Sequence, residues 1–120
     1  MVIVKAQCDL VRFGGKAVLE LNDSNVVKTM ENGNFMLMFY AEWCPLVPPI
    51  FEILNELEQQ EGECFQFAKI HFDFCPEAVK YYGIPGVPTV LAIKNGVVLR
   101  GWAGLTDAVA YRNIVGEIFQ

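Results

Sequence analysis

The sequence predicts an α/β fold in which a mixed central sheet carries helices on both faces, in the order β-α-β-α-β-α-β-β-α. Three observations support this prediction. Apolar runs of strand length alternate with helical segments over most of the chain, which favours crossovers between parallel strands. Asn95-Gly96 separates the last two apolar runs and is typical of an antiparallel hairpin. The length of 120 residues fits one domain.

Five strands are expected from apolar runs, at residues 16–21, 35–41, 64–70, 89–94 and 97–102. The second run, FMLMFYA, is continuous and rich in aromatic residues, which is typical of a strand buried on both faces. Residues 1–15 form an N-terminal segment that ends at Gly14-Gly15, and the α/β domain is expected over residues 16–120.

Four helices are expected between and after these strands. Asp23 or Ser24 caps the first, which runs to about residue 31. The second carries an apolar stripe and ends at Gly62. Pro76 opens the third, which runs to about residue 82, and Thr106 caps the last. The stripe of the second helix is Ile50, Ile53, Leu54 and Leu57, and that of the last is Val109 or Ala110, Ile114, Val115 and Ile118.

Composition and charge exclude several classes of protein. Hydrophobic residues make up 53% and charged residues 19%, which excludes a disordered chain. Nine basic and 14 acidic residues give a net charge of −5, with no basic stripe for nucleic acid. The longest uncharged run, residues 81–93, contains two prolines and falls short of the roughly 20 apolar residues of a membrane span. Lys5 and Asp9 interrupt the start of the chain, which therefore lacks a signal-peptide pattern.

The segment Phe39-Tyr40-Ala41-Glu42-Trp43-Cys44, at the end of a buried strand, resembles the thioredoxin and protein disulfide isomerase family. Further matches at compatible spacing are Phe67-Ala68-Lys69-Ile70 with Asp73, Tyr82-Gly83-Ile84, Gly86-Val87-Pro88-Thr89, Lys94-Asn95-Gly96 and Gly104. The resemblance covers about residues 18–119 and implies a thioredoxin-like fold. In that family the first cysteine of W-C-x-x-C attacks a substrate disulfide, and the second resolves the mixed disulfide.

The motif of this chain is Trp43-Cys44-Pro45-Leu46-Val47, so the first cysteine is present and the second is valine. Cys44 is the candidate catalytic residue. A mixed disulfide on Cys44 would persist until an outside thiol attacked it. The resemblance also matches Met38 to the family's buried aspartate, which serves proton transfer during resolution, and Lys69 to that acid's lysine partner. The replacements at Val47 and Met38 therefore both affect the same step, the resolution of the mixed disulfide.

The prolines of the motif form a third departure from the family pattern. Pro45 alone would suit a first helical turn capped by Cys44, where the helix dipole stabilises a thiolate. Pro48 and Pro49 disfavour helical geometry at the residues before them and lack an N–H. We therefore expect the helix to start late, near Pro48 or Pro49, or to have a distorted first turn. A late start would leave the Cys44 thiol less acidic than in the family.

The resemblance also implies a substrate platform formed by Trp43, Pro45, Val87 and Pro88. We expect the Val87–Pro88 bond to be cis and to lie within about 5 Å of the Cys44 sulfur, so that the Val87 backbone can pair with an extended peptide. The alternative is a proline that simply begins a strand. Lys69 is a supporting residue, with its stem buried and its amine on a polar group. A catalytic role for Lys69 is the alternative.

For the other cysteines and the one histidine, roles outside catalysis are favoured. Cys75 is either a substitute resolving thiol or a distant loop cysteine, and the second is favoured. Cys64 and Cys75 lie at opposite ends of one strand, beyond disulfide reach. Cys8 is either a plain cysteine or an intermolecular one. His71 is structural or at the surface, with no sign of a proton-transfer partner. No ligand spacing for zinc is present, so we expect no metal and no cofactor.

Two functional hypotheses of different classes follow. In the first, Cys44 carries out thiol–disulfide exchange with protein or peptide disulfides, or with glutathione, as at best a monothiol disulfide oxidoreductase. In the second, the chain is a redox-inactive binding module that uses the surface of Trp43 and Pro88. A peroxide-reducing enzyme is a weak third interpretation, since no activating threonine or arginine arrangement surrounds Cys44. We expect a monomer or weak dimer, cytoplasmic if the chain is complete and secretory or ER-lumenal if it is an excised domain.

Overall fold

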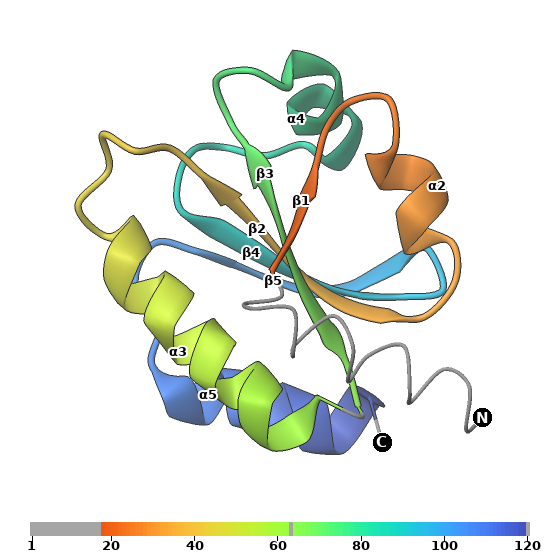
Figure 1. The fold of residues 1–120 in the computed structure, drawn as a ribbon, viewed down its shortest axis with the longest axis vertical. Helices are drawn as coiled ribbons and strands as arrows, with labels where there is room; N and C mark the ends of the chain where they lie inside the picture. Colours follow the sequence, from red (N-terminus) through yellow and green to blue (C-terminus); the bar gives the residue numbers. More distant parts are fainter. Residues whose placement is uncertain (1–17, 63, 120) are drawn as a thin grey trace.

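The computed structural model describes residues 18–62 and 64–119, and its elements follow the expected order (Figure 1). The strands are β1 (Leu19–Leu21), β2 (Asn34–Tyr40), β3 (Gln66–His71), β4 (Thr89–Lys94) and β5 (Val97–Ala103). The helices are α2 (Val26–Met30), α3 (Val47–Glu61), α4 (Pro76–Tyr82) and α5 (Ala108–Ile114), followed by a π-helical segment η1 (Val115–Phe119). The predicted α/β fold is confirmed. The N-terminal segment 1–15, with Cys8, and residues 16, 17 and 120 lie outside the described residues.

Strand β2 lies at the centre of a sheet with the order β1-β3-β2-β4-β5. It runs parallel to β3, with Tyr40 opposite His71, and antiparallel to β4, with Phe39 opposite Thr89. The carboxyl ends of β2 and β3 therefore meet the amino end of β4 at one edge of the sheet. Three loops that are far apart in sequence come together there, and the candidate site is built from them.

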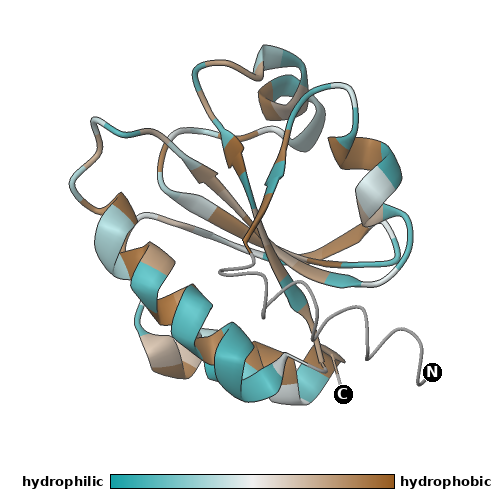
Figure 2. Ribbon diagram, in the orientation of Figure 1, coloured by the Kyte–Doolittle hydropathy of each residue, from teal (hydrophilic) through white to brown (hydrophobic). Residues whose placement is uncertain are grey.

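The sheet separates two apolar layers. Helices α3 and α5 cover one face, and α2 and α4 cover the other (Figure 1). Alternate side chains of β2 enter each layer: Met36 and Met38 pack with α3 and α5, and Leu37 and Phe39 with α2 and α4. Because both faces are covered, the apolar run of β2 is buried from Phe35 to Phe39, as its sequence predicts, whereas Tyr40 at the end of the strand is only half-buried. Figure 2 shows hydrophobic colour along the strands and hydrophilic colour on the outer side of α3.

Helix α3 begins at Val47 with Leu46 as its N-cap, one residue before Pro48. Pro48 and Pro49 therefore occupy the first turn, where backbone N–H groups have no acceptor within the helix and proline is tolerated. This start agrees with the expectation of a late helix that Cys44 does not cap. The predicted stripe is buried at Ile50, Leu54 and Leu57, and the helix ends at Gly62.

The predicted cap of α2 was wrong, and the structure gives Asp23 another role. Asn25 precedes α2 and makes no side-chain cap. The Asp23 carboxylate instead accepts hydrogen bonds from the backbone N–H groups of Glu77 (3.2 Å) and Ala78 (2.8 Å), in the first turn of α4. Because α2 and α4 share one face of the sheet, the carboxylate satisfies donors that lie more than 50 residues away in the chain.

The last helix also differs from the prediction. Asp107, not Thr106, is the N-cap, and its carboxylate accepts from the Ala110 N–H (3.2 Å). Val109 is exposed, and the buried stripe begins at Tyr111 instead. The wider π-helical turn of η1 then shifts the inward-facing position by one residue. As a result, Phe119 is buried, whereas the expected Ile118 is only half-buried.

The hairpin between β4 and β5 is confirmed at Asn95-Gly96. Both residues have positive φ values, 50° and 87°, as a two-residue turn of type I′ requires. The Asn95 side-chain oxygen also accepts from the Gly33 N–H (2.9 Å), which ties this turn to the segment that enters β2.

We predict that Asp23→Ala lowers the free energy of unfolding by about 1 kcal/mol, because two N–H groups of α4 lose their acceptor. Asp23→Asn keeps an acceptor oxygen and is expected to lose less. Ser24→Ala is the matched control, since the Ser24 hydroxyl contacts Asn22 within the same turn. Urea unfolding measures all three variants. Equal losses for Asp23→Ala and Ser24→Ala would contradict the assigned cap.

Candidate functional site

The site lies where the loops after β2 and β3 meet the loop before β4. The Val87–Pro88 peptide bond is cis, and the Cys44 sulfur lies 3.8 Å from the Val87 carbonyl oxygen, to which the thiol donates. The expected cis bond beside Cys44 is therefore confirmed. Pro88 itself is buried, whereas Val87 is half-buried and borders the site.

Cys44 lies in the turn that precedes α3. Its N–H donates to the Ala41 carbonyl (3.2 Å), and its carbonyl accepts from the Val47 N–H (3.2 Å). The side chain is 6% exposed and packs in the same apolar layer as Met38 and Val47. Because Leu46 caps α3, Cys44 lies outside the helix, where the dipole acts more weakly than at a cap.

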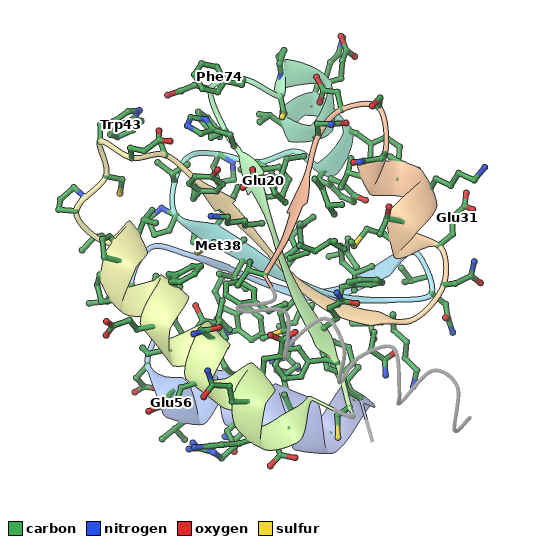
Figure 3. All side chains as sticks on the ribbon, in the orientation of Figure 1. Glu20, Glu31, Met38, Trp43, Glu56 and Phe74 are labelled. Atoms are coloured by element: carbon green, nitrogen blue, oxygen red, sulfur yellow. The ribbon has the colours of Figure 1, made fainter. Side chains whose placement is uncertain are left out.

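An exposed apolar rim surrounds the buried thiol. Trp43 is 65% exposed, Leu46 is 38% exposed, and Pro45 between them also faces solvent. Figure 3 shows Trp43 on the loop that leads into α3. Its indole N–H donates to the carboxylate of Asp73 (2.7 Å), which follows β3. The structure thus brings Trp43, Pro45 and Val87 together around Cys44.

Met38, at the position matched to the family's aspartate, is fully buried between the sheet and α3. Lys69 lies opposite it in the β2–β3 pairing. The Lys69 amine reaches Glu20 on β1 (3.5 Å) and lies over the rings of Tyr40 and Phe51. The Glu20 carboxylate therefore balances the charge of Lys69, as expected for a side chain with a buried stem and its amine on a polar group.

Glu20, which the sequence argument did not single out, also accepts from the Tyr40 hydroxyl, whose oxygen lies 3.0 and 2.9 Å from the two carboxylate oxygens. Burial and the nearby Glu20 carboxylate together raise the pKa of Tyr40 above its usual range, so the phenol stays protonated. Beside these groups a groove of about 580 Å³ is lined by Met38, Phe51 and Lys69, among others.

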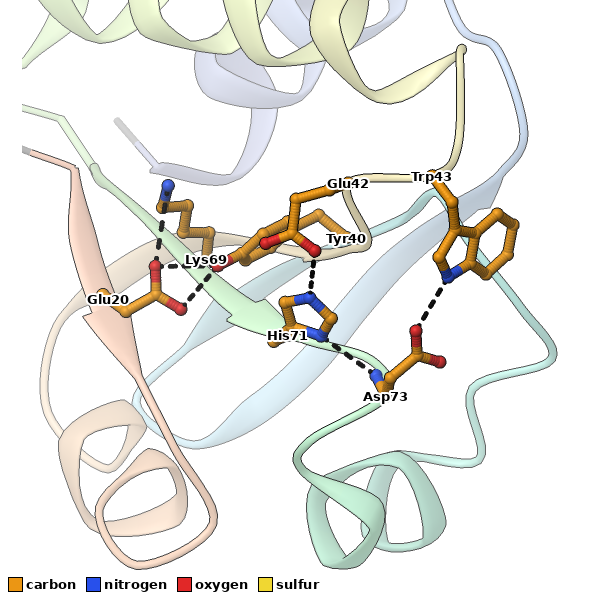
Figure 4. A network of polar contacts seen from close by, with 7 residues as sticks. All are labelled: Glu20, Tyr40, Glu42, Trp43, Lys69, His71 and Asp73. Atoms are coloured by element: carbon orange, nitrogen blue, oxygen red, sulfur yellow. Dashed lines mark hydrogen bonds and ion pairs between the residues drawn. The ribbon is translucent and has the colours of Figure 1, made fainter.

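His71 corrects the expectation of a histidine without a proton-transfer partner. It is 6% exposed, and its Nε2 lies 2.6 Å from the Glu42 carboxylate (Figure 4). This hydrogen bond holds the pKa of Glu42 below its usual value. His71 ends β3, and Glu42 follows the paired end of β2 by two residues. The parallel register between these strands is the signal that could have revealed the pair.

The other described cysteines do not complete the motif. Cys75 is buried in the layer of α2 and α4, whereas Cys44 belongs to the layer of α3 and α5, so the sheet lies between them. No disulfide joins Cys44, Cys64 or Cys75 to one another. Burial raises the pKa of the Cys75 thiol, helped by Asp23. These observations support the interpretation of Cys75 as a structural cysteine.

Two further classes of site were sought in residues 18–62 and 64–119. No group of three or more histidine, cysteine, aspartate or glutamate side chains gathers there to hold a metal ion. Over the same residues, no helix combines the length and apolar character needed to cross a membrane.

The central β2, the cysteine between β2 and α3, and the cis-proline before β4 together define a thioredoxin-like fold. The sequence model of the family described as Thioredoxin matches residues 17–115. The chain therefore belongs to the thioredoxin family.

Individual relatives agree with this assignment. The thioredoxin of Bacillus subtilis is 28% identical over 101 residues, covering 84% of this chain and 97% of its own length. The probable thioredoxin-2 of Caenorhabditis elegans is 38% identical over 69 residues, covering 58% of this chain and 48% of its own length. A mutant thioredoxin from Halobacterium salinarum superimposes with a TM-score of 0.76 at 24% identity, covering 85% of this chain and 90% of the other.

A second solved structure has the same fold. It comes from work on the thiol resolving mechanism in yeast mitochondrial 1-Cys peroxiredoxin via glutathione/thioredoxin systems. It superimposes with a TM-score of 0.76 at 21% identity, covering 85% of this chain and 96% of the other.

We predict that Met38→Asp lowers the free energy of unfolding by roughly 3–5 kcal/mol, because it removes a buried side chain and buries a carboxyl group. Burial raises the pKa of such a carboxyl, so the folded state favours its protonated form. Its stability relative to Met38→Asn, the neutral control, should therefore fall as pH rises from 5 toward the raised pKa. Urea midpoints at pH 5 to 8 measure the difference. A constant difference would show that Lys69 pairs with the new carboxylate.

Proposed function

We propose that this thioredoxin-family protein carries out thiol–disulfide exchange through a single thiol. Cys44 captures a protein or peptide disulfide, and an external thiol such as glutathione releases it. The observation that carries the proposal is the Cys44 sulfur 3.8 Å from the Val87 carbonyl at the cis-proline, with Val47 at the position of the resolving cysteine. The attacking thiol of Cys44 lies beside a backbone carbonyl with which an extended peptide could pair. Val47 supplies no thiol to resolve the mixed disulfide.

The proposed exchange balances without a second protein thiol. The Cys44 thiolate attacks one sulfur of a disulfide R–S–S–R′, the S–S bond breaks, and R′ leaves as a thiolate. An external thiolate then attacks the R sulfur of the mixed disulfide, which frees the Cys44 thiolate and leaves R joined to the external thiol. A second external thiol reduces that product. The yeast work on glutathione/thioredoxin systems makes glutathione the first external thiol to test.

The loop before β4 offers a way to couple peptide binding to the state of the thiol. While protonated, the Cys44 thiol donates to the Val87 carbonyl. A thiolate has no proton to donate, so the carbonyl becomes available to the N–H of an extended peptide. The exposed Trp43 and Leu46 would contact apolar side chains of that peptide.

A second candidate function is a redox-inert binding module on the same surface. The observation that favours it is burial: Cys44 is only 6% exposed, whereas Trp43 beside it is 65% exposed. A partner could therefore bind the rim without reacting with the thiol. The two candidates differ in whether Cys44 is needed for capture.

We predict that the wild-type chain reduces insulin far more slowly than a two-cysteine thioredoxin, because it lacks a resolving thiol. It should instead accumulate a mixed disulfide, visible on non-reducing gels and released by glutathione. Cys44→Ser should abolish this adduct, and Cys75→Ser, on the other side of the sheet, should keep it. An adduct that persists in Cys44→Ser would contradict the proposal. Binding of peptide without any adduct in the wild type would favour the binding module.

We predict that Val47→Cys restores part of the dithiol activity. The Val47 N–H bonds the Cys44 carbonyl, and such a turn brings the two Cα atoms within about 7 Å, inside disulfide range. Activity should stay below that of a typical thioredoxin, because the buried Met38 offers no proton acceptor. Val47→Ala, which removes bulk without adding a thiol, is the control in the insulin assay. A rate equal to a two-cysteine thioredoxin would contradict the role assigned to Met38.

A further inference from the structure

A closed ring of polar contacts joins the loop after β2 to the loop after β3 (Figure 4). Glu42 contacts His71 Nε2 (2.6 Å), and His71 Nδ1 accepts from the Asp73 backbone N–H (3.2 Å). The Asp73 carboxylate accepts from the Trp43 indole N–H (2.7 Å). Because Glu42 and Trp43 are neighbours in sequence, the ring closes. The Glu42–His71 and Trp43–Asp73 links therefore hold the loop that carries Cys44 against the end of β3, and the His71–Asp73 contact connects these two links.

The contacts define which nitrogen of His71 carries the proton. An N–H already points at Nδ1 from Asp73, so Nδ1 must offer a lone pair. The proton of the neutral ring therefore lies on Nε2, where it is donated to Glu42. Protonation of the ring would place a second N–H at Nδ1, facing the N–H of Asp73. Two donors cannot share that position, so this link would break.

We propose that neutral His71 is the positioning residue of Trp43, and that protonation of His71 opens the ring and releases the indole from the site. The proposal deepens the proposed function, on which it rests, because Trp43 borders the place where a peptide would bind. Trp43 is 65% exposed, so few packing contacts hold its indole. The hydrogen bond from the indole N–H to Asp73 therefore contributes much of what keeps the Trp43 ring in one orientation.

Other charged and titratable groups face His71 from each neighbouring element, and they determine which link fails. Tyr40 and Glu42 contact the imidazole from β2 and the loop after it, and Asp73 contacts it from the loop after β3. Lys69 of β3 and Glu20 of β1 both contact Tyr40 instead, and Cys75 lies in the layer of α2 and α4. Lys69 and Glu20 pair with each other. Glu42 attracts a protonated ring and keeps its Nε2–H contact, whereas Phe74, stacked on the ring at 4.2 Å, carries no charge. The contact between Nδ1 and the Asp73 N–H is therefore the one that protonation breaks, and the new Nδ1–H then competes with the Trp43 indole N–H for the Asp73 carboxylate.

Nuclear magnetic resonance of the free, full-length chain tests the proposal without any substrate. The chain has one histidine and two tryptophans, so the imidazole and indole signals are assigned with few alternatives. At pH 8 the imidazole ¹⁵N shifts should show the proton on Nε2. As the pH is lowered from 8 until the imidazole is protonated, the Trp43 indole signal should shift with the same midpoint as the imidazole. The Trp102 indole, which packs on Tyr111, should stay in place.

His71→Asn is the matched variant, because its side-chain oxygen can accept from Asp73 and its amide does not titrate. The Trp43 signal of this variant should stay constant over the same pH range. Three results would overturn the proposal: a proton on Nδ1 at pH 8, an imidazole transition that leaves Trp43 unmoved, or a Trp43 transition that persists in His71→Asn. The first two need only the wild-type chain, so a failure of the variant to fold does not remove the test.

A binding measurement separates this proposal from the proposed function. The probe is carboxymethylated insulin B chain, and the protein carries Cys44→Ala, so that thiol ionisation plays no part and no side chain at position 44 donates to the Val87 carbonyl. We expect the dissociation constant to rise roughly 2- to 10-fold from pH 8 to a pH at which the resonance titration shows the imidazole protonated, the factor for one lost hydrogen bond. The rise should vanish when His71→Asn is added. Absence of binding at both pH values would contradict the platform of the proposed function, while the resonance result still decides the role of His71.

Discussion

The pairing of β2 with β3 on one side and β4 on the other is the constraint on which the site depends. Because β2 is parallel to β3 and antiparallel to β4, the ends of three separate segments meet at one edge of the sheet. Cys44, Asp73 and Val87 come from these three segments. The burial of β2 on both faces fixes this pairing, since a slip of one residue would exchange its Met and Phe side chains between the two apolar layers.

The position matched to the family's buried aspartate is apolar, whereas charged groups lie on β1, on β3 and in the loops after β2 and β3. Met38 fills the buried position, and the lysine opposite it reaches outward to Glu20 and Tyr40. Beside this pair lies the ring of Glu42, His71, Asp73 and Trp43. Met38 carries no proton acceptor, and the ring holds the loop that carries Cys44 against the end of β3.

The prolines after Cys44 show how a local rule and a tertiary arrangement can both be satisfied. Two prolines in sequence forbid a regular helix interior, and the sequence therefore predicts a late helix start. The structure places them in the first turn of α3, where their missing N–H groups leave no acceptor of the helix unpaired. Cys44 is thereby left in the preceding turn, with its carbonyl on the Val47 N–H and its thiol on Val87. The position of the thiol is a consequence of where proline is allowed.

The strand and helix order, the buried β2, the hairpin at Asn95-Gly96 and the valine at position 47, where the resemblance places a second cysteine, could all be predicted from the sequence. These features follow from local propensity and periodicity, or from a motif that is contiguous in the chain. Three features could be recognised only once the elements were packed together: Asp23 caps α4, Tyr111 rather than Val109 faces inward, and His71 bonds Glu42. Each of these depends on which elements lie side by side, and a carboxylate or imidazole takes the nearest donor or acceptor in space rather than in sequence.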